Sequence, residues 1–291
     1  MKFRTEIMTA DAPKILSPER LAVLTGSCFS DNIGARMKGV GWPAEVNPCG
    51  VIYNPVSMAV LYQLALTHRP MRREIVGAGL TRRDGRYVSW LMGSKIAADT
   101  AEECIDAACE CLDRLERGIE SASAIILTFG TSDVWLLKDT DRAVGNCHKH
   151  PASEFERRRV GIDETVELWS QIIAAVRTRN PEVKFILTVS PRRYLADGFA
   201  ENSRQKAVLI LACEKLSKSL PDVFYFPAYE IMNDDLRDYR FYAADLVHPN
   251  DSAIEYVWEK FCNAYLDADG LASLREMEKA AKRAAHRPII T

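Results

Sequence analysis

The chain has 291 residues, of which 47% are hydrophobic and 27% are charged, and its net charge is −2 at pH 7. This composition is that of a globular protein with a sizeable core, and the near-neutral charge provides no basic field that would attract nucleic acid. The N-terminus lacks the apolar stretch of a secretory signal, and no apolar run approaches the roughly 20 residues that span a bilayer. We therefore expect a cytoplasmic protein with no membrane or nucleic-acid partner.

Short apolar runs alternate with amphipathic helical stretches along most of the chain. Strands are predicted at residues 21–24, 42–46, 124–129, 183–189 and 223–226. Helices are predicted at residues 29–40, 55–67 and 201–220, and after caps at Thr100, at Asp163 and at Asn250 or Asp251. Strands separated by helices indicate an α/β fold, with a mainly parallel sheet between two helical layers.

Two segments fit this alternation poorly. Residues 69–98 contain Asp84-Gly85, a hairpin signal between short β-prone pieces, and residues 138–161 are polar and loop-like. We interpret both as insertions into a single domain that spans residues 1–268. Residues 269–291 are charged and helix-prone, which predicts a solvated helix packed on one side.

Cysteine and histidine give weak metal signals. Of the eight cysteines, four fall in helical patterns and are predicted to be small buried hydrophobic residues: Cys104, Cys111, Cys213 and Cys262. The segment NCHKHP, with Cys147, His148 and His150, has the residue types of a zinc site, but its spacing is not a standard zinc pattern and no further cluster completes it. We expect neither a metal nor a cofactor.

Reactive side chains follow the predicted strands. Ser27 follows the first strand, and Thr131 and Ser132 follow the strand at 124–129. Asp245 and His248 precede the last predicted helix. Because ligands bind beyond the carboxyl ends of parallel strands, these residues are expected at one edge of the sheet. Asp245 would orient His248, and His248 would take a proton from a hydroxyl, as in a Ser-His-Asp triad.

The turn GSCFS leaves two alternatives open. Ser27 also suits the N-cap of the helix that follows. Cys28 is the rival nucleophile, although we expect it to tuck against the sheet as a small hydrophobic residue.

The segment GSCFSDNIG is very similar to the signature of GSCFA domains, which are named for this motif, with Ser30 in place of the final Ala. The similarity continues in NPCGVIYNP, TFGTSDVW, NCHK, TVSPRRYLADGFAENSRQKA and FPAYEIMNDDLRDYRFYAADLVHP. These blocks cover most of residues 20–265. GSCFA domains resemble the SGNH (GDSL-like) hydrolases, which implies a flavodoxin-like fold and an esterase site made of Ser27, Asp245 and His248.

The same resemblance implies an oxyanion hole built from the backbone N–H groups of Ser27 and Gly50. SGNH enzymes complete it with the asparagine of a Gly-x-Asn-Asp block, and this chain has no asparagine at that place. Loss of one such donor costs about 10²–10³ in rate, so a replacement is expected. The candidates are Thr131, Ser132 and Asn146.

Two further residues are candidates for substrate contacts. His148 is expected to face a substrate or to hydrogen-bond near it, and Arg192 follows the carboxyl end of a strand, where a ligand would lie. Arg237 and Arg240 stand among aspartates, so we interpret them as partners in structural ion pairs.

The sequence therefore predicts a serine hydrolase that removes O-acyl groups from a carbohydrate or another small polar substrate. Two alternatives remain. The first is a binding or regulatory module with little catalysis. The second is a cysteine-dependent acyl transferase that uses Cys28.

Overall fold

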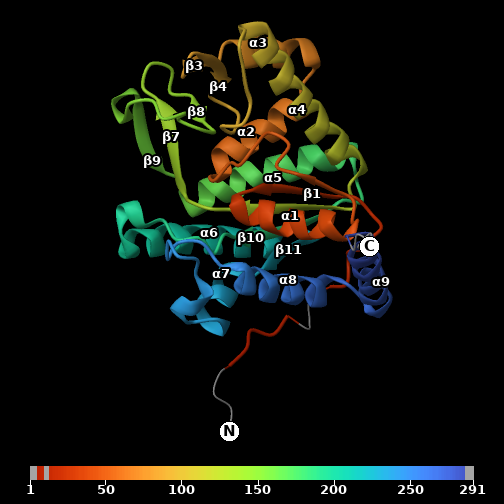
Figure 1. Ribbon diagram of the computed structural model, residues 1–291. Helices are drawn as coiled ribbons and strands as arrows, with labels where there is room; N and C mark the ends of the chain where they lie inside the picture. The colour runs from red at the N-terminus through yellow and green to blue at the C-terminus, as the bar shows by residue number, and fades with distance from the viewer. Residues whose placement is uncertain (1–4, 10–12, 286–291) are drawn as a thin grey trace, which may run out of the picture.

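The computed structural model describes residues 5–9 and 13–285 of the chain. Its centre is a five-stranded sheet, parallel throughout, with the strand order β11-β10-β6-β1-β2 (Figure 1). These strands are β1 (Ala22–Gly26), β2 (Ala44–Val46), β6 (Ala124–Phe129), β10 (Lys184–Val189) and β11 (Val223–Phe226). The five predicted strands and the parallel sheet are confirmed.

Helices pack on both faces of this sheet. They are α1 (Cys28–Val40), α2 (Pro55–Ala65), α3 (Arg69–Gly77), α4 (Ala101–Ser121), α5 (Ile162–Arg179), α6 (Phe199–Ser219), α7 (Ala228–Glu230), α8 (Asp251–Tyr265) and α9 (Ala268–Ala285). Side chains of α2, α4, α5 and α6 form one apolar cluster with the sheet, and side chains of α1, α8 and α9 form a second. Figure 1 shows α2 and α5 on one side of the strands and α8 on the other.

Neighbouring residues of each central strand belong to opposite clusters. In β1, Val23 packs in the first cluster and Leu24 in the second, and in β6 Ile125 and Ile126 divide in the same way. Because side chains alternate across a strand, a sheet covered on both faces needs continuous aliphatic runs. This explains why AVLTG and AIILTF read as unbroken apolar stretches.

The two predicted insertions form small antiparallel sheets. One consists of β3 (Leu80–Arg83), β4 (Arg86–Ser89) and β5 (Ala97–Ala98), and its turn has positive φ at Asp84 and Gly85, as the hairpin signal predicted. The other consists of β7 (Asp133–Leu137), β8 (Ala143–Val144) and β9 (Phe155–Arg159). The prediction of a loop at 138–161 was therefore wrong, because β8 and β9 pair with β7 from that segment.

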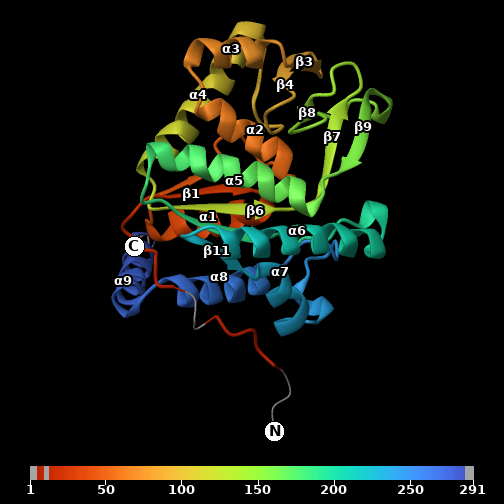
Figure 2. The ribbon, with the colours of Figure 1, turned by 180° about the vertical axis from the view of Figure 1, so that it is seen from behind.

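The two small sheets lie side by side at one end of the molecule (Figures 1 and 2). The amide of Gly145 donates to the carbonyl of Trp90 at 2.7 Å, and the rings of Trp90 and Phe155 meet edge to face at 5.6 Å. The insertions, far apart in sequence, therefore form one joint structure.

Helix boundaries follow local capping. Thr100 and Glu103 form the predicted capping box, and Asn250 caps α8. Asp163 does not cap α5, since the cap is Gly161 and Asp163 lies in the first turn. There its carboxylate still interacts favourably with the helix dipole.

The C-terminal helix α9 packs against α1, with Leu274 buried in the second cluster. Residues 286–291 of the predicted helical tail lie outside the described residues. Within residues 5–9 and 13–285, no helix combines the length and apolarity needed to cross a membrane.

Candidate active site

The central sheet brings several loops to one edge. Since its strands are parallel, the residues after β1, β2, β6 and β10 leave the sheet on the same side. The chain order reverses between β1 and β6, because β2 lies on one side of β1 and all later central strands lie on the other. A crevice for ligands is expected at such a reversal, and there the turn after β1 meets Thr128 near the end of β6.

The turn after β1 holds Ser27 tightly. A Cβ on Gly26 would come within 2.3 Å of the Thr128 carbonyl oxygen, so only glycine fits at this point. The Ser27 amide donates to that same carbonyl at 3.2 Å, and its Oγ accepts from the Phe29 amide at 3.2 Å. Ser27 is 0% exposed. Its predicted role as the N-cap of α1 is confirmed, whereas its role as nucleophile stays a prediction.

Cys28, the first residue of α1, is half-buried rather than packed away against the sheet. Burial and, more weakly, the Asp31 carboxylate raise the pKa of its thiol, while the positive charge of Arg192 and, more weakly, that of Lys206 oppose this rise. Cys28 is thus less buried than expected for a small hydrophobic residue packed against the sheet, and its role as nucleophile stays a prediction.

Asp245 and His248 form the predicted pair. The Asp245 carboxylate contacts His248 Nδ1 at 2.6 Å and accepts the amides of Val247 and His248 at 2.9 and 3.0 Å. These bonds hold the pKa of Asp245 well below its usual range. The Arg193 amide donates to the Val247 carbonyl at 3.2 Å, which ties the loop to the segment after β10. In the described part of the chain, no hydrogen bond joins His248 to Ser27.

Gly50 lies in a turn with φ of +82°, and a Cβ there would come within 2.7 Å of the Gly93 Cα. Its amide already donates to the Asn47 carbonyl at 2.8 Å. The glycine is therefore required by the backbone geometry, and its expected oxyanion role would need this bond to open. Gly50, Tyr53 and Asn146 line a pocket of about 210 Å³ next to this turn.

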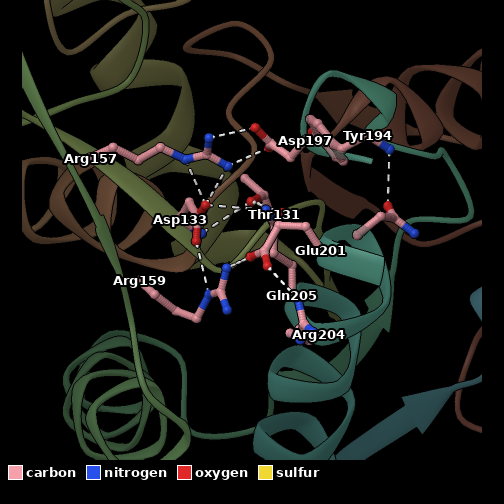
Figure 3. A network of polar contacts seen from close by, with 10 residues as sticks. Thr131, Asp133, Arg157, Arg159, Tyr194, Asp197, Glu201, Arg204 and Gln205 are labelled. Carbon is pink, nitrogen blue, oxygen red and sulfur yellow. Dashed lines mark hydrogen bonds and ion pairs between the residues drawn. The ribbon is translucent and has the colours of Figure 1, made fainter. Parts of the chain in front are cut away.

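The Thr131-Ser132-Asp133 block joins a network of ion pairs (Figure 3). Thr131 donates its hydroxyl to Gln205 at 2.7 Å, and Asp133 accepts from Gln205, Arg157 and Arg159. Arg157 also pairs with Asp197. We call Thr131, Asp133, Arg157, Arg159, Asp197 and Gln205 the Asp133 network. Within this network the Thr131 hydroxyl already donates a hydrogen bond to Gln205. The neighbouring Ser132 is fully buried.

His148 holds the insertions together. It is 1% exposed, and its Nε2 donates to the Ser89 carbonyl at 2.8 Å. Burial lowers the pKa of His148. This hydrogen bond joins the two insertions, and a role of His148 in substrate binding stays a prediction. Asn146 accepts the His148 amide at 2.7 Å.

Among residues 5–9 and 13–285, no group of three His, Cys, Asp or Glu side chains is placed to hold a metal ion.

A buried lysine was missed in the sequence. Lys206 is 1% exposed, and its ammonium donates to the carbonyls of Gly130 and Ser190 at 2.6 and 2.7 Å. Burial and the nearby charge of Arg192 lower the pKa of Lys206 to about 7. A signal was available, since Lys206 lies on the same helical stripe as Leu209 and other buried residues of α6.

Arg192 and two tyrosines complete this cluster. The Arg192 guanidinium lies 4.8 Å from the ring centre of Tyr194 and 5.9 Å from that of Tyr53. Its Nε is buried and has no hydrogen-bond acceptor among the described residues. We call Cys28, Tyr53, Arg192, Tyr194 and Lys206 the Cys28 cluster.

Three solved structures resemble this chain at low similarity. A carbohydrate esterase family 3 protein from Talaromyces cellulolyticus has 8% sequence identity and a TM-score of 0.36, covering 89% of this chain and 99% of that chain. A mutant acetyl esterase with an acetate ion has 9% identity and a TM-score of 0.36, covering 90% and 99%. An acetyl xylan esterase from the rumen bacterium Butyrivibrio proteoclasticus has 11% identity and a TM-score of 0.35, covering 90% and 66%. At these TM-scores the likeness carries no argument.

No curated protein matches the chain. The model of the GSCFA family matches residues 22–261, a span that includes the turn after β1, the five central strands and the loop of Asp245 and His248. Since the match covers most of the chain, this protein belongs to the GSCFA family.

Proposed function

We propose that this protein hydrolyses ester bonds through a covalent acyl-enzyme. The observation that carries the proposal is the 2.6 Å contact between Asp245 and His248, held in a loop beside the segment that follows β10. In a catalytic triad, an imidazole oriented by a carboxylate in this way acts as the base. We also infer that the sheet and its two helical layers are of the SGNH-hydrolase type, which the strand order and the position of this pair support.

The proposed reaction needs a nucleophile from the turn that contains Ser27 and Cys28. Because His248 Nδ1 contacts Asp245, Nε2 is the ring nitrogen left to take the nucleophile's proton. His248 then returns that proton to the leaving alkoxide, and an acyl-enzyme forms. Water, deprotonated by the same nitrogen, releases the acid.

The surface beside His248 supports a carbohydrate or other small polar ester as substrate. The Arg193 guanidinium lies 5.6 Å from the ring centre of Phe199 and 5.0 Å from that of Tyr239. Both rings are more than half exposed. Flat exposed rings beside a cationic hydrogen-bond donor suit the faces and hydroxyls of a sugar.

A second candidate function is a binding module with little catalysis. The amides of Ser27 and Gly50, which the resemblance assigns to the oxyanion hole, already have backbone acceptors. An enzyme would have to supply other donors, whereas a binding module would not.

The test is hydrolysis of a panel of acetylated sugars and p-nitrophenyl esters by the wild-type chain and His248→Gln. We expect kcat to fall by about 10²–10⁴ in the variant, because general acid–base catalysis contributes that factor. His68→Gln is the matched control, since His68 is exposed and makes no capping hydrogen bond with its side chain. A folded wild-type chain that binds acetylated sugars but cleaves no ester would favour the binding module.

A further inference from the structure

Ser27 and Cys28 are neighbours in the same turn, yet their surroundings differ. The Ser27 hydroxyl caps α1 and has no exposed surface. Attack by Ser27 would require both the loss of this cap and an opening of the turn. Cys28 begins the helix and is half-buried, and the positive charge of Arg192 acts on its thiol.

Cys28 is accompanied by two cations that have no carboxylate partner in the described residues. Arg192 appears in no ion pair there, and its buried Nε–H has no acceptor. Lys206 donates only to the carbonyls of Gly130 and Ser190, which are uncharged. A buried donor without an acceptor is costly, so it is retained where a ligand supplies the acceptor.

The amide nitrogen of Cys28 adds to this field. As one of the first four N–H groups of α1, it has no acceptor within the helix. The helix dipole places positive potential at the same end. The helix end and Arg192 thus both favour negative charge beside the thiol, whereas Asp31 in the first turn of α1 opposes it.

We propose that the nucleophile is the Cys28 thiol and that the Arg192 guanidinium replaces the missing asparagine as an oxyanion donor. This inference rests on the proposed ester hydrolysis and names the residues that carry it out. Lys206 is a positioning residue, which fixes the ends of β6 and β10 through the carbonyls of Gly130 and Ser190.

The steps balance as follows. His248 takes the thiol proton, and the sulfur of Cys28 bonds to the carbonyl carbon while the oxygen gains the electron pair and accepts from Arg192. The C–O bond of the ester then breaks, and the alkoxide takes the proton from His248. Water attacks the resulting thioester and gives its proton to His248. The C–S bond breaks, and the thiolate recovers that proton. Burial raises the pKa of Cys28, which explains why a base is needed.

The experiment locates the acyl group on the full chain. The wild-type protein is mixed with p-nitrophenyl acetate and quenched in acid before steady state, and its peptides are analysed by mass spectrometry. We expect acetyl on Cys28, removable by neutral hydroxylamine as a thioester. In Cys28→Ser the adduct becomes an oxyester that resists this treatment. In Cys28→Ala kcat falls on the order of 10³-fold or more.

Cys147 is the matched control within the same chain. It is also half-buried, and burial raises the pKa of its thiol to about 11. We expect Cys28 to acylate far faster than Cys147, and Cys147→Ala to keep wild-type turnover.

Each other outcome decides against the inference. Acetyl on Ser27, or labelling of Ser27 by a fluorophosphonate, would overturn the assignment of Cys28 and leave ester hydrolysis standing. Wild-type turnover in folded Cys28→Ala would do the same. If the folded wild-type chain neither acylates nor hydrolyses any ester of the panel, the proposed function fails together with this inference.

Discussion

The Asp133 network and the Cys28 cluster both lie at the carboxyl edge of the central sheet, and adjacent residues of α6 reach into them. Gln205 donates to Asp133 in the first at 3.1 Å, whereas Lys206 reaches the second. In the network, Asp133 faces two arginines, and one of them also pairs with Asp197. In the cluster, Arg192 and Lys206 face aromatic rings and backbone carbonyls.

This difference separates structural charges from functional ones. Charges that are paired and hydrogen-bonded leave little capacity for a ligand and mainly fix the geometry. Cations left without counter-charges raise the free energy of the folded state, unless an anion or a developing oxyanion compensates them. The resemblance to SGNH enzymes directs attention to Thr131 and Ser132, but the structure places the uncompensated charge at Arg192.

Among the variants that compare these two regions, the largest effect is expected for Arg192→Gln. If Arg192 stabilises the oxyanion, kcat for ester hydrolysis falls by about 10²–10³ while KM changes little. Arg158→Gln is the control, because Arg158 is exposed and pairs with Glu164 at the surface. Steady-state kinetics of both variants measure the changes in kcat and in KM separately. A rise in KM alone would make Arg192 a substrate-binding residue and would weaken the contrast between the two regions.

Asp133→Asn is expected to act on stability instead. Asp133 is 5% exposed, and the neutral asparagine would leave Arg157 and Arg159 without the negative charge that they pair with at this position. We expect the free energy of unfolding to fall by about 1–3 kcal/mol in urea denaturation, with kcat unchanged for the folded fraction. Asp197→Asn, at the more exposed end of the network, should cost less. A loss of kcat in folded Asp133→Asn would show that the network participates in catalysis.

Much of the fold could be predicted because the central strands are continuous aliphatic runs and their helices carry clear caps. Residues 223–226 and the capping box at Thr100 are found as predicted. The short strands β8 and β9 could not be recognised, because FERRR is exposed along most of its length and carries no apolar alternation. Their pairing with β7 is a tertiary contact that local pattern does not encode.

The parts of the candidate site that could be predicted are those in which the spacing of two residues along the chain decides whether their side chains meet. Asp245 and His248, three residues apart before a helix, contact each other as expected. The sequence could not show which of Ser27 and Cys28 lies open, because that depends on the close approach of Gly26 to Thr128. The helical stripe of α6 indicated Lys206 only weakly, because lysines are rarely fully buried and surface exposure is the ordinary expectation.

The smallest effect concerns the pH dependence of stability. The pKa of Lys206 is lowered to about 7 in the folded chain, against 10.5 in the unfolded chain. Between these values the unfolded state binds the extra proton, so the stability of the wild-type chain should rise with pH by at most about 1.4 kcal/mol per pH unit. The window to measure is pH 7 to about 8.5, before thiols ionise in the unfolded chain. Lys206→Met loses two hydrogen bonds, so its free energy of unfolding should be lower at every pH. The increase of this free energy with pH should also be absent in the variant. An equal slope of stability against pH in both proteins would mean that Lys206 keeps its charge because an anion compensates it. The contrast between the Cys28 cluster and the Asp133 network would then no longer hold.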